Sequence, residues 1–372
     1  MTYAQMKERV LNYFTLPGNG VYTVNTGKEK KEKLFQVLYE TKDQTLAEKK
    51  WKESLDQFPL SPLVTIIGVA SDNGGGILRG ANWGPLYLRE TLYTSGETIT
   101  AFDMGDVRVI PHLLHDKYLN QPTIDHCREA LYGKKETDLP VSPLSIVEDF
   151  CRNHHQVFPH KKIFAMGGDH SIAYPLVKEY LSAKKREGKK VAIIHFDAHT
   201  DLLKERLGID LCFGSWAGQI TDLMEDKSLL IQIGIRSSGK PKKYWEKEFG
   251  VKQYWAHEFK ERKIDDICLE IINHLKDKSV DELYVSFDID SLDQEYAGAT
   301  GTPEKGGLSP HEPMLLLQLL YEAFPITGAD LMEVAPLTNP FPHQSKSLEP
   351  ETTLMVASTF ATFLIQAMGV KR

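Results

Sequence analysis

Three side chains of the types that bind metal ions lie within five residues near the middle of the sequence. Asp197, His199 and Asp201 follow the apolar run 191–194, which is typical of a buried strand. Because alternate side chains of an extended chain point to the same side, these three groups face one way and the residues between them face the other. The pattern fits a metal ion at a strand end, and also a polar strand end whose Asp and His are hydrogen-bonded.

Two further strand ends carry the same kinds of side chain. His170 lies in Gly-Gly-Asp-His-Ser after an apolar stretch at 163–166, and Asp288 and Asp290 follow another at 283–287. Two imidazoles and four carboxylates are too many ligands for one zinc ion and suit two bridged divalent ions, whose charge would offset the repulsion between carboxylates. Mixed oxygen and imidazole ligation favours Mn²⁺, although Fe, Co, Ni or Zn could occupy the site.

Alternating strands and helices must position these groups. The predicted strands are 64–70, 99–102, 163–166, 191–196, 229–233, 283–287 and 326–332; the predicted helices are 172–185, 244–249, 264–275, 310–323 and 350–368. Apolar strands that alternate with helices indicate a parallel sheet with helices on both sides, and such sheets bind ligands beyond the carboxyl ends of their strands. The ligand-type residues should therefore meet at one edge. Residues 107–140 predict a long polar connection.

Composition and motifs exclude several classes of protein. The net charge of −7, from 44 basic and 51 acidic residues among 372, gives no basic footprint for nucleic acid. No window reaches the ~18 apolar residues of a membrane span, and the start has no signal-peptide core. Four cysteines without a Cys-x-x-Cys pair argue against a disulfide framework. The glycine-rich segment 72–80 lacks the spacing of nucleotide-binding loops. We expect a cytoplasmic protein that acts on a small molecule.

The first 58 residues differ from the rest, because they are rich in Lys and Glu with only modest apolar spacing. We interpret residues 1–58 as a helical N-terminal extension with a solvated face, and residues 59–372 as the catalytic domain. An oligomer contact or a lid over the active site are the alternatives for the extension.

The motifs, in this order, resemble those of the ureohydrolase family, which includes arginase, agmatinase and formimidoylglutamase. The resemblance covers roughly Leu63 to the C-terminus and rests on residues 167–171, 197–201, 286–293, 300–303 and 333–336. It implies a three-layer α/β/α fold with a largely parallel sheet of about eight strands, and a homo-oligomer, usually a trimer or hexamer. The implied reaction is hydrolysis of a C–N bond in a linear amidine, with release of urea or formamide.

The resemblance also assigns roles to individual residues. His170 and Asp201 would bind one ion, His199 and Asp290 the other, and Asp197 and Asp288 would bridge the two. Glu333 would orient the cationic group of the substrate, and Asp201 would pass a proton to the leaving nitrogen. Asp201 and Glu333 are thus the predicted catalytic residues. His195 shares the face of Asp197 and is expected to support the ligands from the core.

The residues expected to contact the substrate differ from those of arginase. Phe213 stands where arginase and agmatinase carry a His thought to shuttle protons; formimidoylglutamases also lack that His. In the basic loop 234–243, Arg236 and Lys240 lie where arginase has acidic residues for the ammonium group of its substrate. We predict a guanidino or formimino substrate other than arginine, with an acidic tail, near Arg236, Lys240 and Phe213. A solvated lysine face is the competing interpretation of this loop.

A second interpretation of the whole chain belongs to another class of function. Phe213 and the Lys-rich extension are compatible with a catalytically silent relative that serves as a metal-binding or assembly subunit. The intact set of ligand-type residues argues against it.

Overall fold

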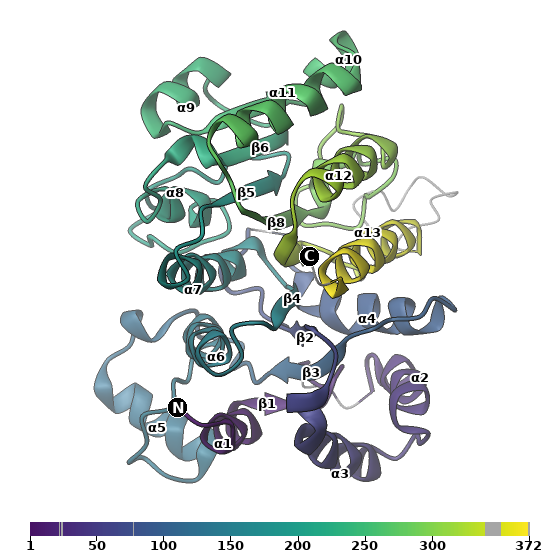
Figure 1. Cartoon of the computed structure of the whole chain (residues 1–372). Helices are drawn as coiled ribbons and strands as arrows, with labels where there is room; N and C mark the ends of the chain where they lie inside the picture. The colour runs from purple at the N-terminus through teal and green to yellow at the C-terminus, as the bar shows by residue number, and fades with distance from the viewer. Residues whose placement is uncertain (22, 24, 77, 339–350, 371–372) are drawn as a thin grey trace.

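The computed structural model describes residues 1–21, 23, 25–76, 78–338 and 351–370 (Figure 1). These residues form one nine-stranded sheet with the order β1-β3-β2-β4-β9-β8-β5-β6-β7. The strands are β1 Phe14–Thr15, β2 Val64–Gly68, β3 Phe102–Val107, β4 Lys162–Met166, β5 Val191–Phe196, β6 Leu230–Ile235, β7 Lys252–Trp255, β8 Glu282–Asp288 and β9 Ile326–Met332. Only β1 is antiparallel to its neighbour, so eight of the nine strands run parallel. The predicted α/β fold with a largely parallel sheet is confirmed.

Helices cover both faces of this sheet, which makes three layers (Figure 1). The helices are α1 Tyr3–Tyr13, α2 Lys28–Tyr39, α3 Gln44–Ser54, α4 Gly84–Thr94, α5 Gln121–Tyr132, α6 Pro143–Val157, α7 Ala173–Arg186, α8 Trp216–Thr221, α9 Lys242–Phe249, α10 Glu258–Glu261, α11 Ile264–Asp277, α12 His311–Ala323 and α13 Glu351–Gly369. Successive strand residues enter different cores. In β5, Ile194 packs in the core of α4, α11, α12 and α13, whereas Ile193 packs in the core of α6, α7 and α8.

Several elements were not predicted in place, among them β1, β3, β7, α5, α6, α8 and α10. β3 begins at Phe102, where the predicted strand ends, because its sequence Phe-Asp-Met-Gly-Asp-Val places two acidic residues, of which Asp106 is buried, where an apolar pattern would mark a strand. β7 is short and has Gln253 fully buried. α5 lies in the segment predicted as a polar connection and buries no residue, so it shows no apolar face. α6 follows it. Ile77 of the glycine-rich segment and Pro350 of the last predicted helix lie outside the described residues.

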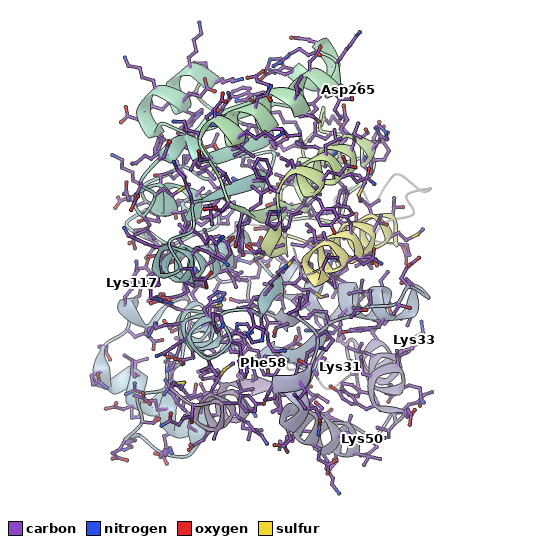
Figure 2. All side chains as sticks on the ribbon, viewed as in Figure 1. Lys31, Lys33, Lys50, Phe58, Lys117 and Asp265 are labelled. Atoms are coloured by element: carbon purple, nitrogen blue, oxygen red, sulfur yellow. The ribbon has the colours of Figure 1, made fainter. Side chains whose placement is uncertain are left out.

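The N-terminal segment is built into the fold. It contributes β1 to the sheet edge, in addition to the helices expected there. The indole of Trp51 is buried and donates to the carbonyl of Met104 in β3. Part of the Lys-rich run is paired, because Lys33 of α2 lies 2.8 Å from Glu90 of α4 (Figure 2). The segment therefore packs along the β3 side of the sheet.

α13 has the length and hydropathy of a membrane-spanning helix, with 56% of its apolar window buried. Its side chains contribute to the same core as α4 and β9. Burial against the sheet accounts for this composition.

A buried ion cluster fixes the β3 side of the sheet. Arg89 of α4 is fully buried and donates to Asp103 at 2.8 Å and to Asp106 at 2.6 Å. The other oxygen of Asp106 accepts from the amide of Gly20, 2.9 Å away. Burial alone would lower the pKa of Arg89, but the charge of Asp103 and then Asp106 raises it. The guanidinium thus joins a helix, a strand and the N-terminal segment.

Replacing Arg89 should destabilise the protein strongly. Arg89→Met would leave two carboxylates buried without their cation, so we expect a loss of about 3–5 kcal/mol in the free energy of unfolding, measured by urea denaturation. The control is Arg152→Met, because Arg152 is 49% exposed where it pairs with Glu148 and should contribute at most about 1 kcal/mol. Equal effects of the two changes would contradict this account of the cluster.

Candidate metal centre

The predicted ligands lie at the carboxyl ends of neighbouring strands. The strands β4, β9, β8 and β5 are adjacent in the sheet. His170 follows β4, Glu333 follows β9 and Asp288 ends β8. Residues 197–201 follow β5. β4 and β5 follow one another in the sequence but are separated in the sheet by β9 and β8, which come later in the chain. The order of the strands across the sheet therefore switches between β4 and β5. That is the place where open parallel sheets bind ligands.

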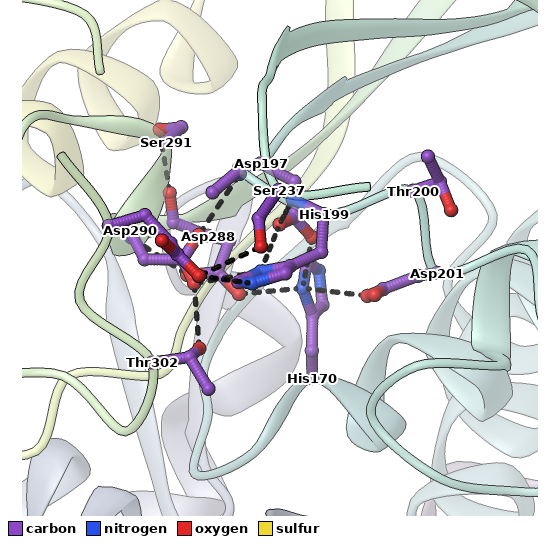
Figure 3. A network of polar contacts seen from close by, with 12 residues as sticks. His170, Asp197, His199, Thr200, Asp201, Ser237, Asp288, Asp290, Ser291 and Thr302 are labelled. Carbon is purple, nitrogen blue, oxygen red and sulfur yellow. Dashed lines mark hydrogen bonds and ion pairs between the residues drawn. The ribbon is translucent and has the colours of Figure 1, made fainter. Parts of the chain in front are cut away.

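His170 faces three carboxylates through one ring nitrogen. Its Nδ1 lies 3.0 Å from Asp288 Oδ2, 3.2 Å from Asp197 Oδ2 and 3.5 Å from Asp201 Oδ2 (Figure 3). The ring is almost fully buried, as are the three acids. His170, His195, Asp197 and Asp201 offer ligand atoms within 4.8 Å of one another, a spacing that one ion could span.

His199 forms a second group with two of the acids. Its Nδ1 lies 3.1 Å from Asp290 Oδ2 and 3.3 Å from Asp197 Oδ1 (Figure 3). Asp197, His199 and Asp290 again offer ligand atoms within 4.8 Å. Asp197 belongs to both groups and uses a different oxygen in each, which is the geometry required of a bridging carboxylate. The structure thus brings all six predicted metal ligands together, and their individual metal-binding roles stay a prediction.

The charges in this cluster are balanced only in part by its own imidazoles. Burial would raise the pKa of Asp197, but hydrogen bonds with His170, His195 and His199 hold it well below the usual value. Burial and the charge of Asp197 raise the pKa of Asp201 well above the usual value, and burial with Asp290 and Asp197 does so for Asp288. A cation would relieve both effects, so the donor set and its electrostatics fit a divalent metal pair.

The two predicted catalytic residues have an uncommon backbone conformation. Asp201 has φ 50° and Glu333 has φ 63°, in the left-handed region that residues with a Cβ seldom adopt. Such conformations cost about 1–3 kcal/mol each and persist where the surroundings enforce them. Trp216 Nε1 donates to Asp201 Oδ2 at 2.8 Å, and Glu333 Oε1 accepts from the amide of His170 at 2.9 Å. Both acids are therefore held in place at the site.

A buried chain of hydrogen bonds orients His170. Ser286 Oγ donates to Asp330 Oδ1 at 2.8 Å, and Tyr284 donates to the other oxygen of Asp330. With its proton engaged, the Ser286 hydroxyl accepts from Nε2–H of His170, 2.9 Å away. Nδ1 of His170 is then the nitrogen turned toward the carboxylates, and it would bind a metal ion in place of the proton that it shares with them.

His195 supports Asp197 from the core, as its position in β5 predicted. Gln232 donates to Nδ1 of His195 at 3.0 Å, so Nε2–H of His195 donates to Asp197 Oδ2 at 2.9 Å. Gln232 in turn accepts from Gln253 of β7. The ring of His195 therefore presents a proton to the cluster, which disfavours it as a ligand although its nitrogen lies near enough.

The three residues predicted near the substrate have different surroundings. Arg236 donates to six backbone carbonyls, those of Gly234, Asp290, Ser291, Leu292, Glu304 and Lys305. These bonds engage every donor group of the guanidinium, so Arg236 braces the loop after β8. Lys240 is exposed and its ammonium lies 5.6 Å from the ring centre of Tyr244. Phe213 is half-buried between Arg206 and the glycine-rich loop, where its amide donates to the carbonyl of Gly74.

Glu304 is a neighbour of the site that the sequence did not single out. Its Oε1 accepts from Ser237 Oγ at 2.8 Å and lies 3.7 Å from Nε2 of His199, with the side chain 39% exposed. The signal was available, since Glu304 directly follows the 300–303 motif. Ser286 also lay inside a recognised motif, whereas Trp216 and Asp330 gave no pattern that separates them from core residues.

Comparison with known proteins places this fold and site in one class, that of arginase-fold hydrolases. Residues 63–364 match the arginase family, and the chain belongs to it. It is 30% identical to a mitochondrial agmatinase of Gallus gallus over 82% of this chain and 81% of that protein. It is 28% identical to a mitochondrial guanidino acid hydrolase of Homo sapiens over 73% and 70%. The crystal structure of formimidoylglutamase from Bacillus subtilis shares the fold, with 22% identity, a TM-score of 0.61 and coverage of 82% and 86%. Enzymes of this family have binuclear metal centres.

Ser286 should control metal affinity without binding the metal. Ser286→Ala removes the acceptor for Nε2–H of His170 and leaves Asp330 short of one donor, so we expect metal to bind about 10–100-fold more weakly in a chelator competition. Ser182→Ala is the control, because Ser182 lies inside α7 and donates only to the carbonyl of Lys178 in the same helix, so its loss should not change metal affinity. Unchanged affinity in Ser286→Ala would show that the chain through Asp330 does not orient His170.

Proposed function

We propose that this protein is a hydrolase that uses two divalent metal ions, Mn²⁺ in the first place, to cleave a C–N bond of a small guanidino or formimino substrate. The observation that carries the proposal is the meeting of six ligand-type side chains from three strand ends, with Asp197 shared between two groups. Membership of the arginase family, whose relatives include agmatinases and a guanidino acid hydrolase, supports the reaction class.

The donor set fits such a metal pair. His170 with Asp197 and Asp201 would hold one ion, His199 with Asp197 and Asp290 the other, and Asp288 would be the second bridge. Four carboxylates match the four positive charges of two divalent ions. When bound, the pair supplies a hydroxide nucleophile from water at neutral pH and stabilises the negative charge that develops during attack.

Glu333 and Asp201 would act on the substrate itself. One oxygen of Glu333 is engaged by the amide of His170, while Oε2 lies beside Gly301 and accepts from none of the described residues. A cationic amidine could pair with this oxygen and be oriented for attack. Asp201 is held at the site by the hydrogen bond from Trp216, so it would be placed to pass a proton from the attacking water to the leaving nitrogen.

The charge of the substrate tail is open to a direct test. The prediction of an acidic tail loses support from Arg236, whose donors are engaged by carbonyls, and keeps only the exposed Lys240. Glu304 lies nearer, beside His199, and would favour a cationic or neutral tail. We propose a guanidino substrate whose tail is sensed by Glu304, with formimino substrates as the other candidates.

The proposal also covers the oligomeric state of the protein and its location in the cell. A homo-oligomer, trimeric or hexameric, and a cytoplasmic location remain proposals that follow from the resemblance to ureohydrolases and from the composition. Size-exclusion chromatography with light scattering would test the first.

The central prediction concerns metal and turnover together. The purified protein loaded with Mn²⁺ should hold two ions per chain by elemental analysis and release urea, ammonia or formamide from at least one of arginine, agmatine, guanidinobutyrate, formiminoglutamate and guanidine. Asp288→Asn should lower kcat/KM at least ~10³-fold, equivalent to about 4 kcal/mol of transition-state stabilisation, because the site loses a bridging charge.

Asp265→Asn is the control, since Asp265 is exposed in the first turn of α11, at the upper edge of the molecule in Figure 2. Two bound ions without any product would favour the silent metal-binding or assembly subunit. Full turnover in Asp288→Asn would remove the bridging role.

Glu304 gives a prediction about the tail. Glu304→Gln should raise kcat/KM for guanidinobutyrate relative to agmatine by about 10-fold, which corresponds to ~1.4 kcal/mol for one partly solvated charge contact. Lys240→Gln should leave that ratio within about 2-fold, because Lys240 is exposed beside Tyr244. The opposite ranking of the two variants would restore the acidic-tail interpretation of loop 234–243.

A further inference from the structure

A cavity lies between the N-terminal segment and the glycine-rich loop. Its volume is about 540 Å³, and its walls come from residues 20, 21 and 23, from the residues after β2 and from residues 109 and 111 after β3. Its lining contains none of the six predicted metal ligands and not Glu333. The N-terminal segment, which the metal centre does not use, forms one side of it.

Two acceptor or donor groups at the base of this cavity have no partner. Ser71 lines it and is 1% exposed, yet its hydroxyl makes no hydrogen bond with the described residues. The neighbouring carboxylate of Asp72 is also buried. Its Oδ2 accepts from the amides of Gly80 and Ala81, at 2.6 and 3.1 Å, and its Oδ1 accepts from no described residue. A buried hydroxyl and carboxylate oxygen left in this state are suited to a ligand that donates hydrogen bonds.

The lining of the same cavity also contains a cationic side chain, that of Arg79. Arg79 is exposed and has no ion pair or hydrogen bond with any residue that the structure describes. The charge of Arg79 acts on Asp72, but the two groups form no salt bridge, so each keeps capacity for a ligand. Asn82 lies in the same lining as a further amide.

The remaining wall is apolar. Val21, Ala70, Val109 and Pro111 line it together with the indole of Trp83. Trp83 is held against the N-terminal segment, since a Cβ at Gly27 would come within 3.0 Å of its ring. A ligand here would meet a carboxylate, a guanidinium and apolar side chains in one cavity.

We propose that this cavity binds a free α-amino acid with an apolar side chain, its carboxylate on Arg79, its ammonium on Asp72 and Ser71, and its side chain against Trp83 and the valines. Neither an inorganic anion nor a simple amine would use both charged groups. The site is separate from the metal centre but adjoins it, because the carbonyl of Ser71 accepts from the amide of Asp169, next to His170. The proposal does not depend on the proposed reaction.

The test uses the metal-loaded protein and three related probes in calorimetric titrations: L-leucine, L-leucinamide, which lacks the carboxylate, and 4-methylpentanoate, which lacks the ammonium. L-Leucine should saturate the protein with a Kd of ~1 mM or lower, and each of the other probes should bind at least ~10-fold more weakly. Equal binding of the three, or no saturation by leucine, phenylalanine or valine at tens of times that concentration, would overturn the proposal.

Variants locate the binding. Arg79→Gln should weaken leucine binding at least ~10-fold by removing the carboxylate partner, and Ser71→Ala should weaken it several-fold. Arg206→Gln is the matched control, because Arg206 is also exposed but lies over the ring of Phe213. Leucine binding that survives Arg79→Gln, or that is lost in Arg206→Gln or Glu333→Gln, would assign it to the catalytic site and contradict a second site.

Discussion

A buried carboxylate is tolerated only where protons or cations surround it, and Asp197 is the place where this protein concentrates that requirement. Its two oxygens contact His170, His195 and His199, and three further carboxylates lie within reach of the same imidazoles. The imidazoles do not offset all of this negative charge, since the pKa values of Asp201 and Asp288 stay well above the usual value. The rest of the centre, from the turned backbone at Asp201 to the bonded Nε2 of His170, follows from placing that excess of negative charge where metal ions can balance it.

The hydrogen bonds that stabilise Asp197 continue through His195 to the β7 edge of the sheet. Gln232 of β6 and Gln253 of β7 are fully buried, and together they connect His195 to the indole of Trp255, which donates to Gln253. Polar residues inside strands weaken the apolar pattern by which strands are recognised, and β7 was missed for this reason. β3 was misplaced for a related one, because Asp103 and Asp106 are buried against Arg89. In both strands the partners of the polar groups lie far away in the sequence.

Features with a local sequence signal could be predicted, and features that depend on partners distant in the sequence could not. The six ligand-type residues were found because they follow apolar strands at two-residue spacing, and both signals are local. The residues that orient these ligands carry no such local signal. Nothing near Asp330 or Trp216 distinguishes a polar or aromatic core residue that supports a metal ligand from one that does not. Arg236 shows the opposite error. Its charge suggested a carboxylate partner, whereas the fold turns the guanidinium onto backbone carbonyls that only the folded loop assembles.

The glycine-rich loop lies between the cavity and the metal centre, and its glycines are explained by close packing. A Cβ at Gly74 would lie 2.2 Å from Ser171 Oγ, and one at Gly168 would lie 1.7 Å from the carbonyl oxygen of Ser71. Gly74 also donates to Asp169 Oδ2 and accepts from the amide of Phe213. The loop can approach the His170 turn this closely only without side chains. On the side of Ser71 and Asp72, the loop is therefore in direct contact, largely through its backbone, with Asp169 beside His170 and with Phe213.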